Sequence, residues 1–118
     1  MIASILTSIL AAAIGGASPV TPAPIRIVAE PRADGIQLSV VGDSEAEYDA
    51  LYTLEVESDV VQEGGSRSVQ RGRARLRPGE VVTLISLRLG RVVPGRWEAR
   101  LLVEPSEGES YTELRNSI

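Results

Sequence analysis

Apolar and polar side chains alternate along most of the chain after residue 24, and this alternation limits the possible folds more than any other feature. It is clearest in one segment, where Trp97, Ala99, Leu101 and Val103 would face one way and the residues between them the other. Successive side chains of a β-strand point to opposite faces, whereas a helix needs apolar residues at i, i+3, i+4 and i+7. No window of helical length shows that spacing after residue 17, so the sequence predicts an all-β domain.

Turn sequences divide this region into segments of strand length. Asp34-Gly35, Gly64-Gly65, Pro78-Gly79 and Pro94-Gly95 combine residues that favour tight turns. Short strands with turns at this spacing are typical of an antiparallel sandwich. We therefore predict a seven-stranded antiparallel immunoglobulin-like (Ig-like) β-sandwich over residues 25–118, with 81–89 as a central strand. The expected strands lie at or within 25–29, 36–40, 52–57, 66–76, 81–89, 97–103 and 111–114.

The core of such a sandwich must be aliphatic, because the chain has no phenylalanine and only one tryptophan. Trp97 would suit a surface that stacks on a sugar. Its place on the apolar side of an alternating strand instead favours a role as an anchor of the core. The chain lacks the cysteines that flank the core tryptophan of true Ig domains, so we expect an Ig-like architecture only.

Three missing residue types exclude most catalytic chemistry. The chain has no cysteine and no histidine, and its twelve basic residues are all arginine. It therefore has no disulfide, thiol nucleophile, Ser-His-Asp relay, ordinary transition-metal site or Schiff-base lysine. The net charge of −4 argues against general nucleic-acid binding, which needs a strongly basic domain. We expect a protein that is not an enzyme and that needs no cofactor, metal or nucleic acid.

The first 24 residues differ from the rest of the chain. Residues 1–17 contain no charged side chain. Their apolar run is shorter than the span of about 20 residues that crosses a membrane. Gly15-Gly16-Ala17 is similar to the small-residue site at which secretory signal peptides are cut. We predict a signal peptide over 1–17, a proline-rich extended leader over 18–24 and export to the periplasm, with a buried N-terminal helix as the alternative for the first segment.

Charge is segregated within the predicted domain. Residues 43–63 hold eight carboxylates and no arginine, and residues 67–77 hold five arginines and no carboxylate. The alternate carboxylates of 43–49 do not match a calcium-binding loop, so we interpret them as a solvated acidic loop. The five arginines stand at odd positions, and an unbroken strand would place them on one face. These five, which we term the arginine stripe, are Arg67, Arg71, Arg73, Arg75 and Arg77.

The arginine stripe has both structural and functional interpretations. Its residues could pair with the acidic segment across the Gly64-Gly65 hairpin, or they could protect an outer strand from sheet-to-sheet aggregation. They could instead attract an acidic or polar polypeptide by electrostatic steering. The charge pattern alone leaves these interpretations open. It makes the stripe our candidate binding site.

Several motifs follow one another in a characteristic order. They are Tyr52-Thr-Leu-Glu-Val-Glu-Ser58, the hairpin Gly64-Gly65-Ser66, Arg75-Leu-Arg-Pro-Gly-Glu80, and Val93-Pro-Gly-Arg96 before the strand at 97–103. With its strands in this order, the sequence resembles the curli-assembly chaperone family, CsgC and its relative CsgH. Where the CsgC branch carries a Cys-x-Cys pair, this chain has Ala50-Leu51-Tyr52. It is therefore more similar to the cysteine-free CsgH branch, and the resemblance implies no thiol chemistry.

The resemblance implies an ATP-independent periplasmic chaperone that keeps curli subunits from forming amyloid before secretion. The partner would be the disordered, amyloid-forming curli subunit polypeptide, held by transient and electrostatically guided binding. We expect a monomer, and we assign the arginine stripe to this contact from charge placement rather than from a family motif. The alternative is a structural or adhesive Ig-like module of a surface assembly, including one that binds carbohydrate.

Overall fold

The computed structural model describes residues 22–60, 64–90 and 92–116, so the predicted signal peptide at 1–17 and most of the predicted leader lie outside the described residues. Regular structure in these ranges is entirely β-strand. No helix long and apolar enough to cross a membrane occurs in them. The seven strands are β1 (Ile25–Arg32), β2 (Gly35–Gly42), β3 (Tyr48–Val60), β4 (Gly64–Leu76), β5 (Val82–Leu89), β6 (Val92–Pro105) and β7 (Tyr111–Arg115).

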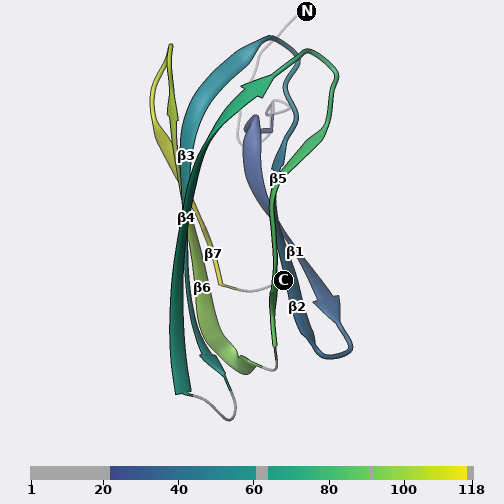
Figure 1. Cartoon of the computed structure of the whole chain (residues 1–118), viewed down its shortest axis with the longest axis vertical. Coiled ribbons are helices and arrows are strands. Elements are labelled where there is room, and N and C mark those ends of the chain that lie inside the picture. Colours follow the sequence, from purple (N-terminus) through teal and green to yellow (C-terminus); the bar gives the residue numbers. More distant parts are fainter. Residues whose placement is uncertain (1–21, 61–63, 91, 117–118) are drawn as a thin grey trace, which may run out of the picture.

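The strands form two antiparallel sheets, which Figure 1 shows as two facing layers. One sheet has the order β1-β2-β5 and the other the order β4-β3-β6-β7. The chain changes sheets between β2 and β3, between β4 and β5, and between β5 and β6. Two antiparallel sheets of three and four strands, joined by such crossings, are the architecture of Ig-like sandwiches. The predicted fold class is therefore confirmed.

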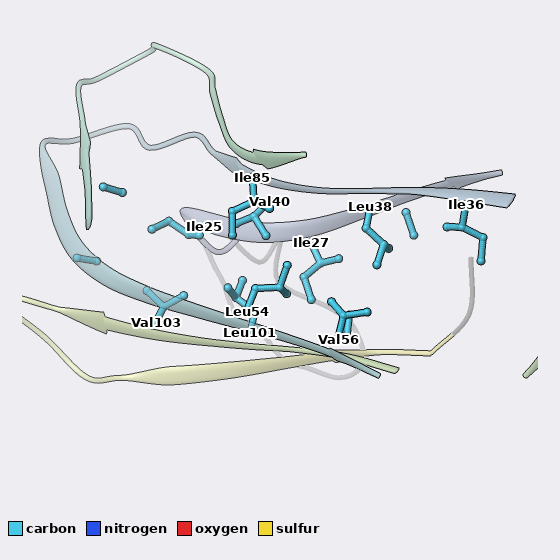
Figure 2. Close-up of a cluster of buried hydrophobic side chains, with 14 of the residues drawn as sticks. Ile25, Ile27, Ile36, Leu38, Val40, Leu54, Val56, Ile85, Leu101 and Val103 are labelled. Carbon is cyan, nitrogen blue, oxygen red and sulfur yellow. The ribbon is translucent and has the colours of Figure 1, made fainter. Parts of the chain in front are cut away.

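Alternation along the strands directs one face of each sheet into a shared core. Figure 2 shows side chains of β1 and β2 facing those of β3 and β6 across the space between the layers. The labelled residues of these strands are Ile25, Ile27, Ile36, Leu38, Val40, Leu54, Val56, Leu101 and Val103. Trp97 belongs to the same cluster and is only 6% exposed. Its predicted role as an anchor of the core is thereby confirmed.

The predicted central position of the strand at 81–89 is wrong. This segment forms β5, which pairs only with β2 and is therefore an edge of the three-stranded sheet. Its pairing is irregular between Val40 and Val41 of β2, and Ile85 is its one buried residue. An apolar, β-branched run indicates that a strand contacts the opposite layer. It does not indicate how many strands pair with that strand in its own sheet. A central strand has two paired neighbours and an edge strand has one.

One predicted turn lies inside a strand instead. Pro94-Gly95 falls within β6, close to the place where the pairing of β6 with β3 is irregular between Ser58 and Val60. Pro94-Gly95 therefore marks a place where the geometry of β6 changes. Gly64-Gly65 begins β4, which pairs antiparallel with β3 as the predicted hairpin requires. Pro78-Gly79 lies between β4 and β5 as predicted, with Gly79 at a φ of 76°.

Side chains of β7 close the edge of the sandwich along β1. The hydroxyl of Tyr111 donates to the carbonyl oxygen of Ile25 at 2.6 Å and accepts from its N–H at 3.0 Å. Glu113 Oε1 accepts from the N–H of Ile27 at 2.9 Å, and Arg115 donates to the carbonyl of Ile27 at 3.3 Å. These bonds satisfy backbone groups that an edge strand otherwise leaves unpaired. The opposite side of the sandwich is bordered by the edge strands β4 and β5.

Replacing Tyr111 with phenylalanine should lower the free energy of unfolding near neutral pH by about 1–2 kcal/mol, because two backbone groups of Ile25 lose their partner. The loss should also depend on pH. Burial raises the pKa of Tyr111 to about 12. The folded protein therefore holds this proton more tightly than the unfolded chain, whose tyrosines titrate near ~10. Its contribution is complete below that pH and disappears as the pH rises to about 12.

Urea unfolding at a series of pH values measures both effects. With no lysine or cysteine in the chain, tyrosines are the side chains that titrate in this alkaline range. The wild type should lose stability as the pH rises from about 10 to about 12, and the Tyr111→Phe variant should lose less. A residual slope should remain, because burial also raises the pKa of Tyr48. Parallel stability curves for the two proteins would contradict the role given to Tyr111.

Candidate functional site

The arginine stripe lies largely on β4, an edge strand of the four-stranded sheet. Four of its arginines, from Arg67 to Arg75, are exposed and alternate with inward residues such as Ala74 and Leu76, which are 2% and 3% exposed. These four therefore point away from the core, as the odd positions predict. Arg77 follows the end of β4. The expectation of one strand face consequently holds for four of the five arginines.

One arginine of the stripe is held by the acidic strand beside it. Arg73 makes two bonds to the carboxylate of Asp49, from Nε at 3.0 Å and from a terminal nitrogen at 2.9 Å. This bidentate geometry is the strongest that an arginine and a carboxylate form. The hydrogen bond from Arg73 holds the pKa of Asp49 below its ordinary value, and the charges of Arg73 and Arg75 contribute in the same direction. The charge of Arg73 is therefore neutralised by a residue of the neighbouring strand.

Arg67 belongs to a second group of charges on the same face. It hydrogen-bonds Glu55 and lies 3.7 Å from the carboxylate of Glu57. Glu55 also lies 3.4 Å from Arg100 of β6, which in turn pairs with Glu98 at 3.0 Å. The hydrogen bond and the charge of Arg67 lower the pKa of Glu55. Cross-strand pairing therefore accounts for Arg67 as it does for Arg73.

The remaining arginines of the stripe are not neutralised in this way. Arg71, Arg75 and Arg77 make no ion pair with any residue in the described ranges. Arg71 stands opposite Thr53 in the register, and Arg75 stands opposite Asp49, whose carboxylate Arg73 already holds. These three side chains present positive charge to the solvent. They are the part of the stripe best suited to bind an acidic group.

Exposed apolar side chains share this face, and they were not among the candidate residues predicted from the sequence. Five large hydrophobic residues are exposed in the described ranges, and four of them lie on the outer face of the four-stranded sheet. They are Leu51, Val69, Leu102 and Leu114, at 53%, 43%, 37% and 52% exposure. Each occupies an outward position of its strand, where the alternation predicts a polar residue. Apolar residues at positions where the alternation calls for polar ones were the sequence signal from which this exposed apolar surface could have been predicted.

A cleft of about 630 Å³ opens where β3 begins and β4 ends. It is lined by Glu47, Tyr48, Asp49, Arg75, Leu76, Arg77, Ser106 and Glu107. Two of the three arginines without ion pairs therefore border a concave surface that also carries carboxylates. No group of three His, Cys, Asp or Glu side chains in the described residues is placed to hold a metal ion.

Aromatic side chains do not form a sugar-binding platform. The chain has one tryptophan and three tyrosines, and all four lie in the described residues. Trp97 is buried, and Tyr48, Tyr52 and Tyr111 are partly buried against the core cluster. Sugar sites of β-sandwiches need an exposed aromatic face. The positions of these aromatic residues do not support the alternative function in which the Ig-like module binds carbohydrate.

Two solved structures share this fold. The curli protein CsgC of E. coli superposes with a TM-score of 0.63 at 13% sequence identity, over 76% of this chain and 94% of that chain. CsgH of R. palustris superposes with a TM-score of 0.60 at 21% identity, over 78% of this chain and 89% of that chain. No protein-family model and no curated protein matches the sequence. The resemblance indicated by the sequence motifs is confirmed in the fold, and the two structures do not separate the branches.

Proposed function

We propose that this chain belongs to the curli-assembly chaperone family and keeps a curli subunit from forming amyloid before secretion. The observation that carries the proposal is the fold shared with both CsgC and CsgH, over at least 89% of each of those chains. Motifs of the sequence indicate the same family independently of the fold. The arginines without ion pairs on β4 supply the electrostatic contact that such a function requires.

The proposed mechanism is passive holding of a disordered client. Amyloid grows when a chain adds strands to an unpaired edge and covers its apolar side chains with those of another chain. Positive charge at Arg71, Arg75 and Arg77 would increase the rate of encounter with an acidic client, and the contacts would remain weak enough for release. This action needs no nucleotide. It needs only a stable sandwich whose own edges do not join the growing fibre.

Export and branch form part of the same proposal. The uncharged segment 1–17 would direct the chain to the periplasm as a signal peptide, and the mature protein would act as a monomer. We assign the chain to the CsgH-like branch because its sequence has no cysteine. Ala50 and Tyr52, which the sequence resemblance matches to the Cys-x-Cys positions, lie on the inward side of β3. Thiol exchange therefore has no place in the proposed mechanism.

A fluorescence assay tests this function directly. Purified protein, at an equimolar or lower ratio, should delay the rise of thioflavin-T fluorescence from a purified curli subunit. An unrelated acidic protein of similar size serves as the control, because it reproduces crowding and net charge without the surface described above. Absence of a delay at every ratio would contradict the proposal.

A further inference from the structure

The exposed leucines of the four-stranded sheet lie on one diagonal of its outer face. Leu51 of β3 stands opposite Glu104 of β6, so Leu102, two residues away, is its diagonal neighbour. Leu102 stands opposite Thr112 of β7, so Leu114 is the next diagonal neighbour. The register thus aligns three leucines from three different strands.

The same diagonal begins at an arginine without an ion pair. Leu51 stands opposite Arg73 of β4, so Arg75 is its diagonal neighbour on that side. The order across the four strands is therefore Arg75, Leu51, Leu102 and Leu114, which we term the diagonal row. Val69, the fourth exposed apolar residue of the face, stands opposite Glu55 and lies outside this row.

The spacing of the diagonal row matches that of an extended polypeptide. Diagonal neighbours in an antiparallel sheet lie about 7–8 Å apart. Side chains on one face of an extended chain repeat every two residues, or about 7 Å. Four consecutive positions of the row can therefore face residues i, i+2, i+4 and i+6 of one extended segment. The first position carries a positive charge, and the other three are apolar.

We propose that the diagonal row binds an extended segment of the client that has one acidic residue followed by apolar residues at every second position. The acidic side chain would meet Arg75, and the apolar side chains would cover Leu51, Leu102 and Leu114. The proposal rests on the proposed function, for which it names the kind of segment recognised. Alternation of this kind is also what lets a segment form the dry interfaces of amyloid, so its apolar face would be covered before it meets another copy.

Binding on the face differs from addition of a strand at the edge. On the diagonal row the client's backbone would keep its hydrogen bonds with water, because the strands beneath it are already paired with one another. Affinity would come from partial burial of three leucines and one charged contact, which is weak and readily reversed. Addition at the edge of β4 or β5 would instead make a ladder of backbone bonds and would be insensitive to the leucines.

A peptide with the predicted pattern tests the proposal. The probe is a nine-residue peptide with one aspartate and then leucine, valine and leucine at every second position, with serine or glutamine between them. The control has the same composition with its apolar residues placed consecutively. Titration of the isotopically labelled protein, followed by NMR, should shift the amide signals of Leu51, Leu102 and Leu114 with the first peptide and much less with the second. Equal binding of both peptides, or shifts confined to β5 or the outer edge of β4, would overturn the proposal.

Single substitutions define the surface. Leu102→Ser should weaken binding of the patterned peptide about fivefold, through loss of buried apolar area. Val69→Ser removes an exposed apolar residue of the same face outside the row, and Val81→Ser removes one outside this sheet. Both should bind as the wild type does. A loss on Val69→Ser as large as that on Leu102→Ser would show a diffuse apolar face and would overturn the diagonal row.

The thioflavin-T assay separates this inference from the proposed function. If the wild type delays curli-subunit amyloid and Leu102→Ser delays it equally, the chaperone function stands and the diagonal row is wrong. If the wild type binds the patterned peptide in the predicted way but delays no curli subunit, the row stands as a peptide-binding surface and the proposed client is wrong.

Discussion

Reversal of charge at Arg71 and Arg75 should abolish the delay of curli-subunit amyloid at an equimolar ratio. The two side chains are exposed and make no ion pair with any described residue, so their positive charge can meet a client. The double variant Arg71→Glu/Arg75→Glu turns attraction into repulsion at both positions. We expect at least about a tenfold higher concentration to be needed for the same delay, because like charges across an interface cost several kcal/mol.

A matched pair on the other sheet separates local contact from net charge. Arg32 and Arg88 are also exposed. Arg32 pairs with Glu30 at 3.3 Å, and Arg88 pairs with Asp34 at 3.6 Å. Arg32→Glu/Arg88→Glu makes the same change in net charge and should keep most of the delay. Circular dichroism should report the same β-type spectrum for both variants. Equal losses in the two variants would assign the effect to net charge and would remove the arginine stripe from the mechanism.

Paired arginines of the same strand should give an intermediate result. Replacing Arg67 and Arg73 by serine frees the carboxylate of Asp49 and leaves that of Glu55 paired with Arg100 alone. Both carboxylates can then compete with the client for Arg71 and Arg75. Added salt should bring the wild type toward the variants, since charges exposed to water are screened over about 8–10 Å at physiological ionic strength. The predicted order of activity is wild type, paired double variant and unpaired double variant.

The sequence was sufficient to predict the faces of strands but not their neighbours. Period-two alternation fixes which side chains turn inward, so Trp97 and the outward direction of Arg71 were predictable without a structure. The position of β5 at an edge was not predictable, because an apolar run has the same pattern in a strand with one paired neighbour and in a strand with two. Likewise Pro94-Gly95 has the composition of a turn, and only the pairing of β6 with β3 shows that it lies inside a strand.

The candidate site could not be predicted without the strand register, for the same reason. Five arginines were visible as one group in the sequence, yet two of them are neutralised by carboxylates more than ten residues away. Whether an arginine is paired depends on which residue of the neighbouring strand stands beside it. The diagonal row depends on three registers at once, those of β3 with β4, β3 with β6 and β6 with β7. No local pattern contains that information.

Gly35→Ala should be the most destabilising alanine substitution among the glycines of the described residues, with a loss of about 3 kcal/mol or more in the free energy of unfolding. Gly35 has a φ of 151°, a value that is nearly restricted to glycine. A Cβ at this position would overlap the backbone oxygen of Leu89 and would lie 2.6 Å from that of Gly90. Backbone atoms of paired strands cannot move aside as the end of a flexible side chain can.

Two other glycines divide this loss into its causes. Gly79 has a φ of 76°, and a Cβ added there would meet nothing within 4 Å, so Gly79→Ala should cost only the backbone strain, about 1 kcal/mol. Gly90 also has open space and no positive φ, so Gly90→Ala should leave stability nearly unchanged. Urea unfolding should therefore rank the losses as Gly35, Gly79 and Gly90. A loss at Gly35 no larger than that at Gly79 would mean that the β1–β2 hairpin moves away from the end of β5, and the close approach that joins these three strands would be wrong.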